Sequence, residues 1–245
     1  MSVYDQKPWL GQYRPGVPAE VHPEFPDALS MFRHAVERDP QRTLIHYFDH
    51  GVSTGDVDRL SDALAVGLAA RGIGRGDRIA VYLQNVPQFV LAMLAAWKVG
   101  AIMVSVNPML RHKEVSLILK DSGARVLITL ESLYHEVAKD VVGDSKVEQV
   151  LTTSELEFLG ATRPTLLKDS KRIACEGSTD LMTLIAQCDG QRPAAQSLNG
   201  DDVALLTYTS GTTGPPKGAM NLHRNIVYNT QVYREWMQLD SNDVI

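Results

Sequence analysis

Cysteine is scarce in this sequence. The 245 residues contain only Cys175 and Cys188, and neither stands in a C-x-x-C pattern or beside a histidine-rich stretch. This spacing argues against a zinc motif and against a disulfide framework. We therefore expect two free thiols, as in a protein of a reducing compartment, and a cytoplasmic location.

A surplus of positive charge is also missing. The chain has 24 Lys and Arg against 29 Asp and Glu, a net charge of -5. The basic residues are scattered along the sequence and form no cluster. A broad electrostatic contact with nucleic acid or with anionic lipid is therefore not expected.

No long uninterrupted apolar run is present. The first 21 residues lack the apolar core of a secretory signal, and residues 1–29 predict an extended arm punctuated by proline. The most apolar segment, residues 89–106, is interrupted by Lys98 and Gly100 and is followed by Asn107 and Pro108. This pattern favours a buried helix followed by a buried strand over a transmembrane helix.

Helical and strand patterns alternate along most of the chain. The predicted strands are apolar throughout instead of at every second position, which is typical of a parallel sheet covered on both faces. We predict an α/β fold with a layered, largely parallel sheet and helices on both of its faces. Strands are expected at 78–83, 101–106, 124–129, 147–152 and 202–209, and helices at 56–71, 87–99, 113–120, from about 132, and after the last strand. Residues 153–200 read as an irregular surface excursion with one helix at 180–187.

Residues 205–218, "LLTYTSGTTGPPKG", form a hydroxyl-rich and glycine-rich loop directly after an apolar strand. Glycine lets the backbone turn with its N–H groups exposed, and such a concave backbone binds anionic oxygens. Threonine and serine add neutral hydrogen-bond donors, and one lysine adds a mobile positive charge. We interpret the loop as a polyphosphate site between a strand and a following helix. Its candidate binding residues are Thr209, Ser210, Gly211, Thr212, Thr213, Gly214 and Lys217.

The loop differs from the two best-known nucleotide motifs. It lacks the Gly-Lys-[Ser/Thr] of a Walker A loop, because Pro216 precedes Lys217 and Gly218 follows it. It also lacks a G-x-G-x-x-G that opens a helix. The alternative reading is a flexible surface loop, but the ordered combination of glycines, hydroxyls and lysine favours phosphate binding.

The string "YTSGTTGPPKG" at 208–218 resembles the phosphate-loop signature of the adenylate-forming superfamily, which includes acyl-CoA synthetases, luciferases and peptide-synthetase adenylation domains. Residues 74–110 are similar to an early segment of the same superfamily, and the runs at 83–87 and 107–108 look most like fatty-acid and other acyl-CoA ligases. Overall the chain most resembles a long-chain fatty acid–CoA ligase, and a medium- or long-chain fatty acid is the expected substrate. The resemblance implies a two-step ligase. A carboxylate attacks ATP to give an acyl-adenylate and pyrophosphate, and coenzyme A then displaces AMP. It also implies that the seven candidate residues hold the β- and γ-phosphates, with Mg²⁺ as the metal cofactor.

The same resemblance implies that residues 30–245 form the first part of a large N-terminal AMP-binding domain. Later motifs of the superfamily, and its C-terminal catalytic domain, have no counterpart here. We therefore expect an N-terminal portion of a longer enzyme, with no complete catalytic set and no adenylation by these residues alone. Two alternatives remain open: an adenylating enzyme for an aryl or amino acid, and a non-catalytic module. We also expect homo-oligomers formed through an exposed sheet edge or an apolar face.

Several other residues are interpreted structurally. His223 is expected to begin a helix and to bond locally instead of acting in catalysis. Trp97 and Trp236 are expected to pack in the core. Asp77 and Arg78 are expected to form an ion pair at a turn.

Overall fold

The computed structural model describes residues 2–209, 216–241, 243 and 244. Within them a seven-stranded sheet has the order β7-β6-β5-β3-β4-β8-β9. All neighbouring pairs are parallel except β8 and β9, which are antiparallel. The strands are β3 (Arg78–Tyr82), β4 (Ile102–Ser105), β5 (Val126–Leu130), β6 (Gln149–Thr153), β7 (Thr179–Asp180), β8 (Val203–Thr209) and β9 (Lys217–Leu222).

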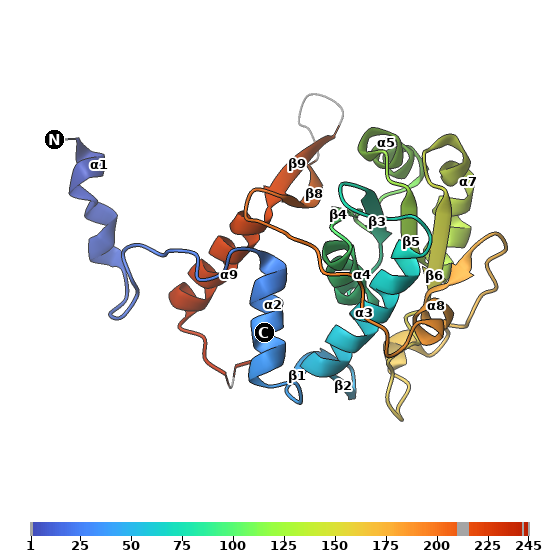
Figure 1. The fold of residues 1–245 in the computed structure, drawn as a ribbon, viewed down its shortest axis with the longest axis horizontal. Helices are drawn as coiled ribbons and strands as arrows, with labels where there is room; N and C mark the ends of the chain where they lie inside the picture. Colours follow the sequence, from blue (N-terminus) through green and yellow to red (C-terminus); the bar gives the residue numbers. More distant parts are fainter. Residues whose placement is uncertain (1, 210–215, 242, 245) are drawn as a thin grey trace.

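Helices cover both faces of this sheet (Figure 1). The chain passes from β3 through α4 to β4 on one side of β3, and from β4 through α5 to β5 on the other side. Because parallel crossovers are right-handed, these two helices lie on opposite faces. The predicted α/β fold with a largely parallel sheet is confirmed. The helices are α2 (Ala28–Arg38), α3 (Thr54–Ala69), α4 (Pro87–Lys98), α5 (His112–Ser122), α6 (Glu131–Leu133), α7 (Lys139–Val141), α8 (Leu181–Gln187) and α9 (His223–Met237).

Local sequence signals explain where the central helices begin and end. The Ser53 side chain accepts a hydrogen bond from the Asp56 N–H and caps the start of α3. Pro87 occupies the first turn of α4, where its missing N–H costs nothing. Gly72 and Gly100, with φ of 77° and 74°, take the left-handed conformation soon after α3 and α4 end. The run at 89–106 is thus a helix and a strand, as predicted. Among the described residues, no helix has the length and apolarity needed to cross a bilayer.

Strands β1, β2, β7 and β9 were not predicted from the sequence, and β9 corrects the position predicted for the loop. The loop was predicted between a strand and a helix, but it joins β8 to the antiparallel strand β9, and α9 begins only at His223. The β9 sequence, KGAMNL, has neither an apolar run nor an alternating pattern. Its conformation comes from pairing with β8, which local preference does not report.

A two-stranded antiparallel hairpin, β1 (Thr43–Tyr47) and β2 (His50–Ser53), also precedes α3 outside the main sheet. Within residues 1–29, predicted as an extended arm, the described part contains a short helix α1 (Val3–Gln6) and a 3-10 turn (Pro8–Gln12). Figure 1 shows α1 at the end of the arm, away from the sheet.

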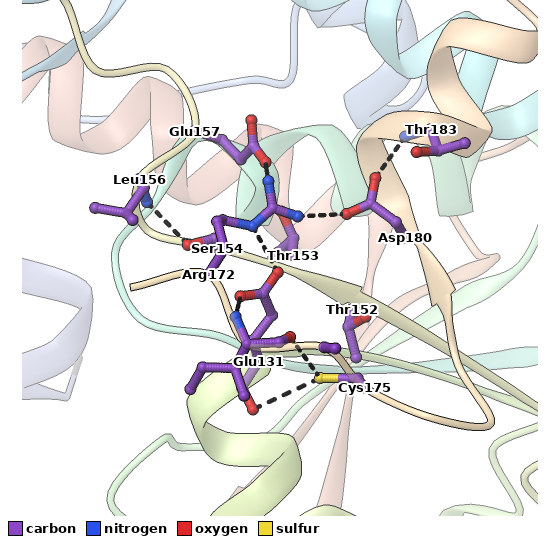
Figure 2. Close-up of polar contacts among 12 residues, drawn as sticks. Glu131, Thr152, Thr153, Ser154, Leu156, Glu157, Arg172, Cys175, Asp180 and Thr183 are labelled. Atoms are coloured by element: carbon purple, nitrogen blue, oxygen red, sulfur yellow. Dashed lines mark hydrogen bonds and ion pairs between the residues drawn. The ribbon is translucent and has the colours of Figure 1, made fainter. Parts of the chain in front are cut away.

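The excursion at 153–200 carries α8 at the predicted position, and a cluster of charges attaches the segment to the sheet. The Arg172 guanidinium lies within 2.7 Å of carboxylate oxygens of Glu131 and Asp180, and within 2.5 Å of Glu157 (Figure 2). Glu131 follows β5 and is almost wholly buried. One arginine therefore binds three carboxylates from separate parts of the chain.

The most deeply buried cation is Lys98 at the end of α4, which the sequence analysis treated only as an interruption of an apolar run. Its side chain is 1% exposed, and its Nζ lies 2.6 Å from Asp58 Oδ1, 2.7 Å from Asp62 Oδ1 and 2.9 Å from Ser61 Oγ. These partners lie on α3. The ion pairs therefore join the two helices that pack together on one face of the sheet.

Two further expectations are wrong. Trp97 packs in the core and donates from Nε1 to the Ala204 carbonyl, as expected, but Trp236 is 44% exposed. Trp236 contacts the ring of Tyr13 in the N-terminal arm edge-to-face. Asp77 pairs with Arg125 at 2.9 Å and not with its neighbour Arg78. The Arg78 guanidinium donates instead to the main-chain carbonyls of Gly76, Ser122 and Gly123. Sequence proximity does not decide which partner a turn carboxylate meets.

Cys175 and Cys188 are free thiols, as expected.

Candidate functional site

The predicted phosphate loop lies at the end of the β8–β9 hairpin. Five of its seven candidate residues lie outside the described part of the structure: Ser210, Gly211, Thr212, Thr213 and Gly214. The other two, Thr209 and Lys217, are cross-strand partners on the last rung of the hairpin, and both are exposed. A hydroxyl group and an ammonium group therefore stand on opposite strands where the two ends of the loop leave the sheet.

The hairpin continues beyond the rest of the sheet. Pairing of β8 with β4 stops at Thr207, opposite Ser105, whereas pairing of β8 with β9 continues for two more residues. The last two rungs before the loop are therefore held within the sheet by the hairpin alone.

A close contact inside the hairpin explains one of the glycines. A Cβ at Gly218 would lie 3.1 Å from Cζ of the Tyr208 ring, which belongs to the opposing residue on β8. The Tyr208 ring therefore lies over the Gly218 backbone. A larger residue at position 218 would displace the ring next to Lys217.

The loop emerges from the edge of the sheet where ligands bind in folds of this class. Strands β3, β4, β5, β6 and β8 are parallel, so their carboxyl ends lie on one edge. The order of the strands reverses at β3 and β4, because the connections that leave these two strands run to opposite faces. In open α/β sheets, ligands bind outside the carboxyl ends of the strands at such a switch point.

A cavity of about 460 Å³ occurs at this switch point. Its walls include Gln84 and Asn85 after β3, Met109 and Arg111 after β4, and Ser132 after β5. None of these residues was predicted to bind a ligand. Their place directly after apolar strands is the signal that could have identified this edge. Met109 lies in a turn, where its N–H donates to Asn107 Oδ1 at 2.9 Å.

His223 lies at the other end of the strands, away from the carboxyl edge where the loop emerges. It follows β9, which returns from the loop over six residues, so its backbone is about 20 Å from the start of that strand. Its ring is buried and packs edge-to-face on Trp97, and its Nδ1 has no hydrogen-bond partner among the described residues. Burial lowers the pKa of His223. The ring therefore packs in the core instead of forming the local bond that we expected, and it does not reach the loop.

No group of three or more His, Cys, Asp or Glu side chains with metal-binding geometry occurs in the part of the chain that the structure describes. The Thr209–Lys217 rung supplies a neutral hydroxyl and a cationic ammonium group, and no carboxylate. Both groups can donate hydrogen bonds to phosphate oxygens.

Comparison with known proteins agrees with this geometry. The chain is 31% identical over 245 residues to a long-chain-fatty-acid–CoA ligase of Bacillus subtilis, covering 96% of this chain and 43% of that protein. It is 34% identical over 176 residues to a 4-coumarate–CoA ligase of Humulus lupulus, covering 72% of this chain and 29% of that protein. The fold matches the crystal structure of a long-chain-fatty-acid-CoA ligase from Archaeoglobus fulgidus with a TM-score of 0.72 at 24% identity, over 94% of this chain and 43% of that one.

The chain thus spans less than half the length of each of these relatives. The family model for AMP-binding enzymes matches residues 32–245, which include the whole sheet and the loop. This chain is a member of the AMP-binding enzyme family.

Proposed function

We propose that this chain supplies the phosphate-binding loop, and the sheet that supports it, to an AMP-forming acid–thiol ligase. The observation that carries the proposal is the pairing of Thr209 with Lys217 on the last rung of the hairpin at the carboxyl edge. Both ends of the loop at 210–216 are thereby attached to a strand. The family membership supports the same reading.

The proposed roles follow from the chemistry of the residues. When a carboxylate attacks the α-phosphate of ATP, negative charge develops on the departing pyrophosphate. Main-chain N–H groups, the hydroxyls of Thr209, Ser210, Thr212 and Thr213, and the Lys217 ammonium would donate hydrogen bonds to the β- and γ-phosphate oxygens. Donors fixed in place before the reaction stabilise such charge most effectively. Mg²⁺ bound to the nucleotide phosphates would neutralise further charge, and coenzyme A would be the second substrate.

A long-chain fatty acid is the carboxylate that we favour, because the Bacillus subtilis relative that covers most of the chain carries that name. An aryl acid is the second candidate, because the Humulus lupulus relative is named a 4-coumarate–CoA ligase. We also propose a cytoplasmic location, consistent with the two free thiols.

By themselves, these 245 residues are expected not to catalyse adenylation. The matched part of the relatives is 43% of the Bacillus subtilis ligase, and phosphate contacts alone give little net affinity after the cost of ordering the loop. Pyrophosphate release by the pure chain that depends on both ATP and a fatty acid would contradict this expectation.

Phosphate binding itself is testable on the chain as it is. Inorganic tripolyphosphate and Mg·ATP would be titrated into the ¹⁵N-labelled protein, and weak binding with chemical-shift changes confined to residues 208–218 is expected. Lys217→Ala should remove most of the response. Lys113→Ala, which removes an exposed lysine from α5, should leave the response unchanged. Shifts located elsewhere, or equal titrations for both variants, would refute the assignment.

A further inference from the structure

The hairpin that carries the loop is attached to helix α5 through one side chain. The Tyr208 hydroxyl donates a hydrogen bond to Asp121 Oδ2 at 2.6 Å, and Asp121 lies in the last turn of α5. The Tyr208 ring also lies against the backbone of Gly218, its partner on β9. One side chain of β8 therefore contacts both the opposing strand and the helix.

The position of Asp121 is not explained by α5 itself. The last turn of a helix carries partial negative charge, so a carboxylate there is unfavourable for the helix. Among the described residues, the bond from Tyr208 is the only polar contact of the Asp121 side chain, and no cation pairs with it. The hairpin, and not the helix, accounts for a carboxylate at this position.

The bond decides which way the last rung of the hairpin faces. Successive side chains of a strand point to opposite faces of the sheet. Tyr208 is held on the α5 face, so Thr209 lies on the other face. Lys217 is the cross-strand partner of Thr209 and shares its face. The two described donors of the proposed phosphate site are therefore presented together on the face away from α5, and both are exposed.

The rungs at 208 and 209 have little other support. Pairing of β8 with β4 ends at Thr207, so neither rung is held by β4. A slip of one residue in such a strand would move every side chain to the other face. In the part of the chain that the structure describes, the Tyr208–Asp121 bond is the only side-chain hydrogen bond that joins either rung to another element.

We propose that Tyr208 and Asp121 are positioning residues for phosphate binding, because their bond fixes the face on which Thr209 and Lys217 meet the phosphate oxygens. This inference rests on the proposed function of the loop. Donors that are in place before the nucleotide arrives bind it without the cost of ordering the strand ends. In this role neither Tyr208 nor Asp121 contacts the phosphates.

Charge and position have opposite consequences at Asp121. A carboxylate near a polyanion repels it, so charge alone would make Asp121→Ala bind tripolyphosphate more tightly. Loss of position would make the same variant bind about threefold or more weakly, because the Tyr208 hydroxyl loses its acceptor. Asp121→Asn removes the charge but keeps an acceptor oxygen, so it should bind at least as tightly as the unmodified protein.

Titration of inorganic tripolyphosphate into the ¹⁵N-labelled chain measures these affinities, at a temperature where circular dichroism shows every variant folded. Tyr208→Phe should weaken binding at least as much as Asp121→Ala. The double variant should bind like Asp121→Ala, because both substitutions remove the same bond. Asp144→Ala is the control, since it removes an exposed carboxylate 3.7 Å from Lys120, the neighbour of Asp121. Its affinity should be unchanged or slightly higher.

Amide exchange without ligand separates this inference from the proposed function. Exchange at residues 208, 209, 217 and 218 should accelerate in Tyr208→Phe and Asp121→Ala, but not in Asp121→Asn. If the unmodified chain binds, then tighter binding by Asp121→Ala, weaker binding by Asp121→Asn, or unchanged exchange would overturn the positioning role alone. If exchange responds as expected but the unmodified chain binds no tripolyphosphate, the proposed function fails, and the role of the pair in phosphate binding fails with it.

Discussion

The Tyr208 hydroxyl donates a hydrogen bond to Asp121 Oδ2 at 2.6 Å, across 87 residues of sequence. Tyr208 lies on β8 just beyond its last pairing with β4, and Asp121 lies near the end of α5. The bond therefore attaches the projecting end of the hairpin to the body of the domain. Burial and the nearby Asp121 carboxylate raise the pKa of Tyr208, so the hydroxyl keeps its proton at neutral pH.

Removing this bond is expected to loosen the base of the loop. Tyr208→Phe should lower the free energy of unfolding by about 1 kcal/mol, the usual net value for one hydrogen bond. Amide exchange should accelerate in residues 203–209 and 216–222. Because the pKa of Tyr208 is higher in the folded state, its contribution is complete below the ordinary value of 10.0 and is lost as the pH rises above it. The stability of the variant should therefore fall less steeply in alkali.

The matched control is Tyr233→Phe, which removes an exposed hydroxyl on α9. Hydrogen exchange followed by mass spectrometry compares the two variants with the unmodified protein. Equal exchange in the hairpin of all three proteins would show that the Tyr208–Asp121 bond does not hold it.

The buried Lys98 allows a test of the ion pairs that connect α4 to α3. Lys98→Met keeps the apolar stem but leaves the carboxylates of Asp58 and Asp62 without their cation. Breaking a buried pair costs about 3–5 kcal/mol, and we expect the lower end because both carboxylates keep some contact with water. Urea unfolding measures the change. Lys120→Met, which removes a half-exposed partner of Asp144, should cost no more than about 0.5 kcal/mol.

The Arg172 cluster should show a pH-dependent effect. Arg172→Gln leaves three carboxylates close together, and about 2 kcal/mol of stability should be lost at neutral pH, below the full buried-pair value because the arginine is half exposed. Burial already raises the pKa of Glu157 above its ordinary value of 4.5. As the pH falls through this raised pKa, the folded state binds a proton more readily than the unfolded chain does. Protonation also relieves the repulsion in the variant.

The difference between Arg172→Gln and the unmodified protein should therefore shrink on acidification. Urea unfolding at neutral pH and near pH 4 measures it. Arg234→Gln, which breaks exposed pairs with Glu24 and Glu235, is the control and should cost about 0.5 kcal/mol or less. A loss for Arg172→Gln that grows in acid would contradict this account of the cluster.

Gly67 tests the packing of α8 on α3. A Cβ at this position would lie 2.7 Å from Leu184 Cδ1, and the Leu184 side chain is buried and has little room to move. Gly67→Ala should therefore destabilise the protein by about 1–3 kcal/mol, although alanine favours helix. Gly74→Ala, at a position with no atom within 4 Å, should be nearly neutral. Thermal unfolding that shows Gly67→Ala at least as stable as the unmodified protein would contradict the contact.

Several features were predictable because their causes are local. The apolar strands, the stop signals at Gly72 and Gly100, and the proline at the start of α4 depend on a few consecutive residues. These local features are sufficient to predict the parallel sheet and a loop that follows a strand. The predicted pairing of Asp77 with Arg78 and the predicted burial of Trp236 were wrong, because each depends on residues far away in the chain.

By itself, the sequence determined the class of fold, the order of its central strands and helices along the chain, and the presence of a loop suited to phosphate. Only the tertiary structure decided that Lys217 begins a strand opposite Thr209, that Lys98 is buried between two aspartates, and that β9 is the last of the described strands in its sheet. The physical reason is that backbone preference acts within a few residues. Strand pairing, burial of charge and edge exposure depend on which distant segments meet in space.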